Sequence, residues 1–271
     1  MGPHKDCIDI ITELGGITDV TAAQRVFEDT IDAENLAKLK HIQNQDVLQK
    51  IANAIKLCEP DTIFIDTGSE ADRQFVRELS LKKGEESPLP MKGHTIHYDL
   101  KEEQGRIIDR TFYIYNQGEE VSSLAKKKDR AEVLEDIRDK MTGIMKGKTM
   151  MAGFFLGGPV GAPASNPALE ISSSTYVMHS AAILYRNVYA DFDQEVEKRG
   201  HFYANIHSEG LNRPEDLPNA RVYMDRSHLT TYSFNCTYAG NTLLMKKGNH
   251  RFSVDRSVYE KKVEQIAEHM F

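Results

Sequence analysis

The sequence has 271 residues, and its 34 lysines and arginines against 41 aspartates and glutamates give a net charge of −7. At roughly 100–200 residues per domain, this length allows one large domain or two modest ones. The acidic balance argues against nucleic acid as a partner, because binding to a phosphate backbone needs a basic surface. Three widely spaced cysteines, Cys7, Cys58 and Cys236, favour a reduced cytoplasmic compartment over a disulfide framework.

No segment of the sequence has the pattern of a membrane span or a signal peptide. The N-terminus lacks both the basic region and the long apolar run that a signal peptide requires. The least polar stretch, residues 150–164, is shorter than a membrane span and is interrupted by glycines and prolines. We therefore expect a cytoplasmic protein with no membrane partner.

The first sixty residues are predicted to be helical. Leu48, Ile51 and Ile55 place an apolar stripe on one helical face, and Thr21–Gln24 has the spacing of a capping box. The run Thr62–Ile65 then predicts a short buried strand, which a Gly/Ser turn joins to another helix. This order of elements is typical of a protein that mixes helices with a sheet.

The rest of the chain alternates between β-rich and helical patterns. Further strands are predicted at Arg106–Tyr115, Lys148–Leu156, Arg221–Met224 and Thr230–Asn235, and further helices at Leu124–Met145 and Tyr259–Met270. The predicted fold class is therefore mixed α/β, with a mixed sheet flanked by helices.

Two motifs suggest a ligand site but do not meet its requirements. Gly143–Thr149 (GIMKGKT) has three residues between its glycines where a P-loop needs four, and it precedes a predicted strand instead of following one. His94 and His97 have the spacing of half a metal site, but no cysteine or carboxylate partners stand at ligand spacing. We interpret the first as a turn and the second as polar surface.

Two other segments have both a structural and a functional interpretation. Asn235–Lys247 (NCTYAGNTLLMKK) combines a tyrosine, a small-residue turn, an asparagine and a lysine pair, which fits either a hairpin turn or a ligand site. Gly157–Pro163 (GGPVGAP) fits a rigid loop, and such backbone also lines active-site clefts.

Three ordered motifs resemble the GTP-dependent phosphoenolpyruvate carboxykinase family. Gly147–Met150 (GKTM) followed by Phe155–Pro163 (FLGGPVGAP) is similar to the family signature GRTM…FSMGPxGSP. Tyr238–Lys247 (YAGNTLLMKK) resembles YGGNSLLGKK, and Ile266–Met270 (IAEHM) resembles LAEHM. Ala239 departs from the first glycine of the family pair. The resemblance covers residues 100–271 and implies the fold of the family's N-terminal, substrate-binding domain.

The resemblance implies roles for four residues in substrate binding. Arg106 matches the arginine that holds the substrate carboxylate and the phosphoryl group, and Tyr238 matches the tyrosine beside the departing CO₂. Gly240 matches the glycine whose backbone amide binds substrate, and Asn241 belongs to the same loop. Arginine's planar fork suits a carboxylate or phosphate. Together with Lys247, Arg106 and Tyr238 form the expected catalytic set.

The resemblance also implies a metal and a reaction. Lys247 and His269 match two ligands of a catalytic Mn²⁺, and a second divalent ion, Mg²⁺ or Mn²⁺, accompanies the nucleotide. The implied reaction is gluconeogenic: oxaloacetate and GTP give phosphoenolpyruvate, GDP and CO₂, so the family is a lyase that acts as a decarboxylase. A metal-bound lysine must be neutral, which lysine, unlike arginine, allows.

The family's P-loop, third metal ligand and base-binding site follow the last motif, and this sequence ends two residues after His269. We therefore expect residues 1–30 to be an unplaced extension and 31–271 to be the N-terminal domain, stopping before the nucleotide domain. On this expectation the chain binds no GTP and is inactive alone. The alternatives are a non-catalytic anion-binding module, or a carboxykinase that uses pyrophosphate or ATP as its donor.

Overall fold

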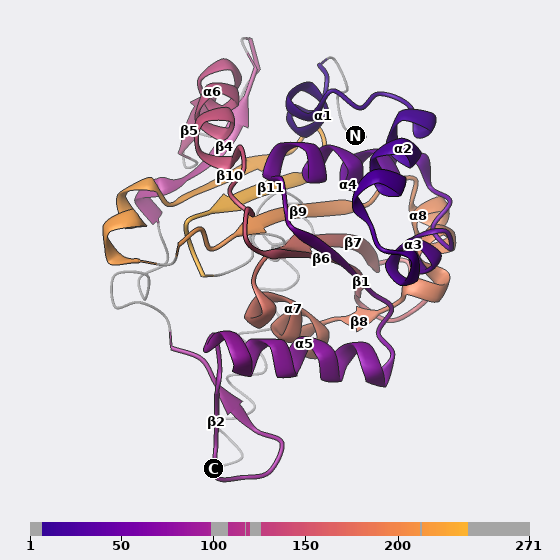
Figure 1. Ribbon diagram of the computed structural model, residues 1–271. Helices are drawn as coiled ribbons and strands as arrows, with labels where there is room; N and C mark the ends of the chain where they lie inside the picture. The colour runs from indigo at the N-terminus through magenta and orange to yellow at the C-terminus, as the bar shows by residue number, and fades with distance from the viewer. Residues whose placement is uncertain (1–6, 99–107, 117, 120–125, 212, 238–271) are drawn as a thin grey trace, which may run out of the picture.

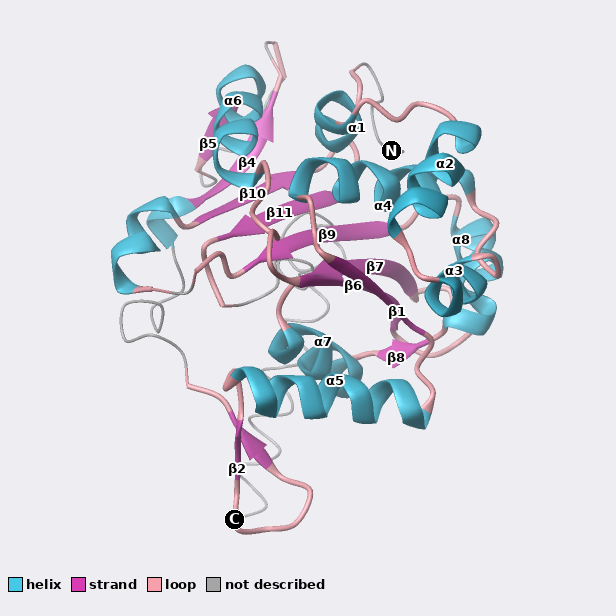
Figure 2. Ribbon diagram, viewed as in Figure 1, coloured by secondary structure: helices cyan, strands magenta, loops and turns pink. Residues whose placement is uncertain are grey.

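The protein is built around one large mixed β-sheet (Figures 1 and 2). The computed structural model describes residues 7–98, 108–116, 118–119, 126–211 and 213–237. Its strands are β1 (Thr62–Asp66), β2 (Ser87–Pro88), β3 (Thr95–Ile96), β4 (Thr111–Tyr115), β5 (Lys127–Asp129), β6 (Thr149–Gly157), β7 (Asn166–Ser172), β8 (Arg186–Asn187), β9 (Tyr203–Ser208), β10 (Arg221–Asp225) and β11 (Thr230–Phe234). The large sheet has the order β1-β6-β7-β9-β11-β10-β4-β5, with β8 paired to β6, while β2 and β3 form a separate hairpin.

Helices cover both faces of the sheet (Figure 1). They are α1 (Ile10–Gly15), α2 (Val20–Thr30), α3 (Ala33–Leu39), α4 (Gln45–Cys58), α5 (Glu70–Lys83), α6 (Arg130–Met141), α7 (Thr175–Leu184) and α8 (Phe192–Arg199), with short 3₁₀ turns η2 (Ile108–Arg110), η3 (Tyr189–Asp191) and η4 (Pro214–Asn219). α1, α2, α4 and α6 lie on one face, and α5 and α7 lie on the other. No helix of the described residues is both long and apolar enough to cross a membrane. The predicted α/β fold, a mixed sheet flanked by helices, is confirmed.

The direction of the central strands decides where the chain's polar groups gather. β7, β9 and β11 run parallel to one another, so their carboxyl ends meet at one edge of the sheet. β6 runs antiparallel to β7 and β10 antiparallel to β11, so both strands begin at that same edge. We call this edge the carboxyl edge.

The apolar stripe predicted in the first sixty residues is confirmed. Leu48, Ile51 and Ile55 lie in α4 and are 8%, 0% and 4% exposed, because α4 lies beneath α1 and α2 and packs towards the sheet. Burying each such side chain contributes about 1.5–3 kcal/mol. α4 is therefore the central helix of this layer.

Three predicted boundaries differ from the structure. The strand predicted at Arg106–Tyr115 begins only at Thr111, because residues 108–110 form η2. The helix predicted at Leu124–Met145 begins at Arg130, after β5. The capping residue of α2 is Asp19, whose carboxylate accepts the Ala22 N–H, so the capping box predicted two residues later is wrong. The helix predicted at residues 259–270 lies outside the described residues.

Close packing of α1 on α4 requires a glycine at position 15. A Cβ there would lie 2.3 Å from Asn53 Oδ1 and 2.7 Å from Asn53 Cα. Asn53 cannot move freely, because its amide accepts from the Ile17 N–H and donates to the Ile17 carbonyl, both at 2.8 Å. We expect Gly15→Ala to destabilise the protein by about 1–3 kcal/mol through overpacking. Urea denaturation measures this, and an unchanged midpoint would contradict the packing described.

Candidate functional site

Small polar side chains fill the carboxyl edge. Those that are at most 4% exposed are Ser172, Ser173, Ser174, His207, Ser208 and Thr237. They come from the ends of β7 and β9 and from the segment that follows β11. Ligand sites of α/β sheets lie outside the carboxyl ends of their strands. This edge is therefore the first place to look for a site.

Hydrogen bonds between neighbouring strands fix these groups in place. Ser172 Oγ lies 2.7 Å from His207 Nδ1, and Ser173 Oγ lies 2.9 Å from Ser208 Oγ. His207 Nε2 lies 2.7 Å from the carbonyl oxygen of Cys236. Burial lowers the pKa of His207 to about 4, so its imidazole is neutral near pH 7. The edge is thus preorganised before any ligand binds.

Two lysine–glutamate pairs border the buried polar groups. Lys148 Nζ lies 3.3 Å from Glu209 Oε1, and Lys83 Nζ lies 3.4 Å from Glu85 Oε1. Lys83 also donates to the Ser173 carbonyl at 3.1 Å. Burial, reinforced by the negative charge of Glu85, raises the pKa of Glu209. The edge therefore carries ammonium and hydroxyl groups, which are donors suited to a small polar anion, beside a carboxyl group whose charged form is disfavoured by burial.

The helix that follows β7 is tied to the same edge. Ser174 caps α7, its Oγ accepting the Val177 N–H at 3.3 Å. The Glu85 carboxylate accepts from Ser174 Oγ at 2.8 Å and from the Tyr176 N–H at 3.0 Å. A carboxylate at the N-terminus of a helix is favourable because the backbone N–H groups there are unpaired. Glu85 thereby joins the end of α5 to α7.

The site residues expected from the resemblance all lie outside the described residues. They are Arg106, Tyr238, Gly240, Asn241, Lys247 and His269. Their positions along the chain are still informative, because the described residues resume two positions after Arg106 and end immediately before Tyr238.

Both segments that carry the expected substrate-binding residues join the structure at the carboxyl edge. Thr237, at the end of the segment following β11, immediately precedes Tyr238. η2 begins two residues after Arg106 and leads into β4, whose first residue Thr111 pairs with Val222 near the start of β10. Because β10 begins at the carboxyl edge, β4 begins there too. The fold therefore brings together the attachment points of segments that are far apart in the sequence.

The central strands also carry buried polar groups on the sheet face that α4 does not cover. Asn205 Nδ2 donates to Glu170 Oε1 at 2.5 Å, and Ser233 Oγ donates to Asn205 Oδ1 at 3.2 Å. These groups, like Ser172 and His207, were not predicted from the sequence. The sequence signal that could have indicated them is the alternation of apolar and polar residues in β7, β9 and β11, whose polar residues are buried.

The glycine–proline segment 157–163 lies away from this edge. It follows β6, which ends at the opposite edge because it runs antiparallel to β7. Ser165 donates to the Pro159 carbonyl, and the Arg199 guanidinium donates to the carbonyls of Ala162 and Pro163. These contacts support the interpretation as a rigid loop. Lys148, in the neighbouring family motif GKTM, does lie at the carboxyl edge, because it directly precedes the start of β6.

The structure explains the two motifs that did not meet the requirements of a P-loop or a metal site, Gly143–Thr149 and the pair His94 and His97. Residues 143–148 form a turn that leads into strand β6, not into a helix. His97 stacks on Tyr176 with ring centroids 3.6 Å apart, and its Nδ1 lies 2.6 Å from the Glu85 carbonyl, while His94 is exposed. Neither arrangement has the geometry of a P-loop or a metal pair.

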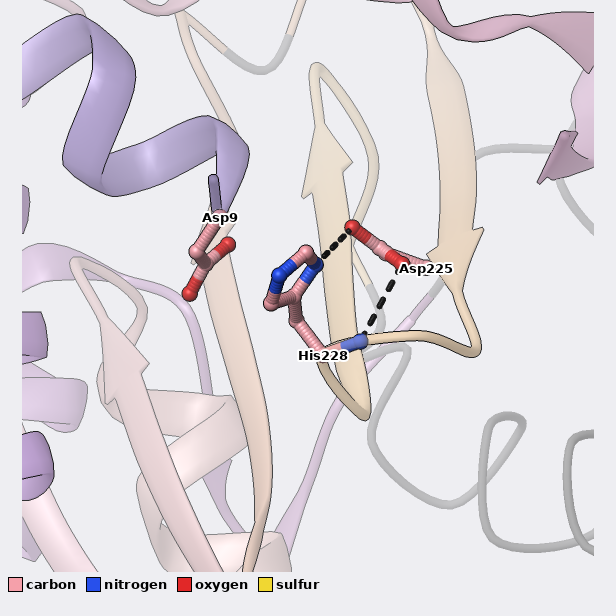
Figure 3. A group of neighbouring side chains, drawn as sticks. All are labelled: Asp9, Asp225 and His228. Carbon is pink, nitrogen blue, oxygen red and sulfur yellow. Dashed lines mark hydrogen bonds and ion pairs between the residues drawn. The ribbon is translucent and has the colours of Figure 1, made fainter. Parts of the chain in front are cut away.

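Among the described residues, Asp9, Asp225 and His228 form a group of side chains of the types that bind metal ions (Figure 3). Their nearest ligand atoms all lie within 4.8 Å of one another. Asp225 ends β10 and His228 lies in the β10–β11 turn, so this group is at the edge opposite the carboxyl edge.

The hydrogen bonds of this group leave no open position for an ion. Lys50 ion-pairs with Asp9, and the Tyr232 hydroxyl donates to the same carboxylate at 2.9 Å. His228 Nδ1 lies 2.9 Å from Asp225 Oδ2, and its Nε2 lies 2.9 Å from the carbonyl of Cys7. A lysine ammonium already neutralises the carboxylate that an ion would need. These residues therefore do not fit a divalent ion, and they instead tie the N-terminal segment to the sheet.

Comparison with known proteins identifies the family. Residues 49–258 match the family model described as the phosphoenolpyruvate carboxykinase N-terminal domain. Relatives named phosphoenolpyruvate carboxykinase (GTP) include those of Thermococcus kodakarensis, 36% identical over 90% of this chain, and Pyrococcus furiosus, 34% identical over 92%. The matched regions cover 39% and 40% of those relatives, so the chain spans about two fifths of their length.

The matched region contains the carboxyl edge as well as the segments around Arg106 and Tyr238. The mixed sheet flanked by helices is consistent with that domain. This chain belongs to the phosphoenolpyruvate carboxykinase N-terminal domain family.

Proposed function

We propose that this chain is the substrate-binding part of a GTP-dependent phosphoenolpyruvate carboxykinase, and that it binds oxaloacetate and phosphoenolpyruvate at the carboxyl edge. The observation that carries the proposal is the convergence of two segments on one polar edge. The segment with Arg106 attaches through η2 and β4, and the segment with Tyr238 attaches through Thr237. The names of the relatives support the reaction class.

The chemistry of the residues agrees with this role. The substrates carry carboxylate and phosphoryl groups, which the Arg106 guanidinium binds through paired N–H donors. Tyr238 would lie beside the carboxylate that departs as CO₂, and the Gly240 N–H would donate to the substrate. The two lysines of the carboxyl edge, Lys83 and Lys148, place ammonium donors near the attachment points, each paired with a glutamate.

In this proposal Lys247 and His269 would hold Mn²⁺, with a second divalent ion accompanying the nucleotide. A divalent ion bound there would supply Lewis-acid stabilisation of the enolate oxygen. The described residues provide no alternative site, since Asp9, Asp225 and His228 are occupied by one another and by Lys50. The gluconeogenic direction, the use of GTP and a cytoplasmic location belong to the same proposal.

Calorimetry tests the substrate-binding role. We expect the chain to bind phosphoenolpyruvate, and oxalate as a stable analogue of the enolate, and we expect Arg106→Ala to weaken binding about tenfold or more, because a charge-assisted hydrogen bond is lost. The matched control is Arg138→Ala, which removes the same charge from α6, where Arg138 pairs only with Glu135 among the described residues. No heat from the wild-type chain at millimolar ligand would contradict the proposal.

The same protein tests the expectation that it is inactive alone. We expect no turnover of oxaloacetate and GTP by the purified 271-residue chain. A steady-state assay for phosphoenolpyruvate measures this, and turnover by the chain alone would overturn that part of the proposal while leaving substrate binding intact.

A further inference from the structure

The side chain of His207 connects the strand β9 to the segment that carries Tyr238. His207 is 0% exposed and lies in β9, between the end of β7 and the segment after β11. Its Nδ1 faces Ser172 Oγ and its Nε2 faces the Cys236 carbonyl, each at 2.7 Å. The residues it joins are 35 and 29 positions away in the sequence. The contact is therefore a product of the strand order.

The partners of His207 determine which nitrogen carries the proton. A carbonyl oxygen only accepts hydrogen bonds, so Nε2 must donate to Cys236. Nδ1 then has a lone pair, and the Ser172 hydroxyl donates to it. Ser172 Oγ in turn accepts the Ser174 N–H at 3.0 Å. The direction of every hydrogen bond from the start of α7 to the Cys236 carbonyl is thereby fixed.

The backbone around Cys236 is where the chain leaves the sheet. The Asn235 N–H donates to the Ser208 carbonyl at 2.9 Å, continuing the pairing of β11 with β9. Asn235 then has φ of 53°, in the left-handed region where the chain changes direction. A Cβ at residue 210 would lie 2.0 Å from Asn235 Oδ1, so Gly210 leaves the room that this turn needs. The next peptide carbonyl is the one that His207 holds.

We infer that His207 is a positioning residue for substrate binding. By holding the Cys236 carbonyl, it fixes the backbone from which the chain continues through Thr237, the residue that directly precedes Tyr238 in the sequence. The ligand whose affinity it controls is a short anion with carboxylate or enol-phosphate groups. This role rests on the proposed function, because it acts through the Tyr238 segment.

Two substitutions of His207 separate its two hydrogen bonds. In His207→Gln the side-chain amide nitrogen reaches the position of Nε2 and keeps the donation to Cys236. In His207→Asn the shorter side chain stays near Ser172 and loses that donation. We expect His207→Gln to bind oxalate within about twofold of wild type and His207→Asn to bind about tenfold more weakly, because a buried carbonyl loses its donor.

Calorimetry with oxalate gives the affinities, and thermal unfolding of the same samples shows whether each variant is folded. Weak binding by folded His207→Asn together with rescue in His207→Gln supports the role, since general destabilisation would not restore affinity selectively. Equal affinities in all three proteins would overturn it and leave the proposed function standing. No binding by the wild-type chain would instead overturn the proposed function and this role with it.

A measurement on the wild-type chain is independent of whether the variants fold. Nitrogen-15 NMR of the histidine side chains distinguishes a proton on Nε2 from one on Nδ1. We expect His207 to be neutral with its proton on Nε2 at pH 7. A proton on Nδ1 would mean that the ring does not donate to Cys236, and would overturn the inference.

Discussion

Replacing Lys50 by methionine is expected to lower the free energy of unfolding by about 3–5 kcal/mol, because it leaves the largely buried carboxylate of Asp9 without the lysine cation. Lys50 is 6% exposed, ion-pairs with Asp9, and donates to Thr230 Oγ1 at 2.8 Å. Burial alone would raise the pKa of Asp9, but the charges of Lys50 and His228 lower it below its ordinary value. Asp9 therefore stays ionised and needs a cation.

The double variant Asp9→Asn/Lys50→Met tests this explanation. It removes both charges, so we expect it to recover most of the stability that Lys50→Met loses. The matched control is Lys146→Met, where an exposed lysine pairs with Glu59, and we expect a change within about 0.5 kcal/mol. Urea denaturation at pH 7 measures all three. Additive losses in the double variant would contradict the explanation.

Acidification from pH 6.5 to 4 is expected to remove about 3 kcal/mol of stability through His207 alone. Burial lowers the pKa of this imidazole from 6.5 to about 4. In that range the unfolded chain binds a proton that the folded chain does not, so stability falls by about 1.4 kcal/mol for each pH unit. Well above pH 6.5 the residue is neutral in both states and contributes no pH dependence.

The difference between the wild type and His207→Gln isolates this contribution. Other groups titrate in the same range, including His201, whose pKa burial also lowers. They contribute equally to both proteins. We expect the stability difference between wild type and His207→Gln to change by about 3 kcal/mol between pH 6.5 and 4. Parallel stability curves from urea denaturation would show that His207 is not buried as a neutral ring.

Local patterns in the sequence predicted α4, β1, β6 and the β10–β11 pair, but they did not predict the strands β7 and β9 or the helices α7 and α8. The stripe Leu48, Ile51 and Ile55 predicted α4 because helical periodicity directly reports a buried face. The start of β4 was missed because Arg110 forms a 3₁₀ turn and donates to the Leu217 carbonyl, a contact with η4 that no local pattern records. Boundaries depend on such tertiary contacts more than on propensity.

The candidate site was likewise predicted only in part from the sequence. The motifs around Arg106 and Tyr238 were found in the sequence through the family resemblance, but the edge that they join was not. Ser172, His207 and Cys236 meet only because β7, β9 and β11 lie side by side, in an order that skips β8 and β10. Strand order is set by the packing of the whole sheet. Sequence spacing therefore could not reveal this buried network.

Hydrogen exchange with and without oxalate shows where on the protein the ligand binds. We expect slower exchange at residues 172–174, 207–210 and 235–237 of the carboxyl edge, and unchanged exchange in the β10–β11 turn around His228. Protection confined to the opposite edge, or none at a saturating concentration of oxalate, would contradict the placement of the substrate site.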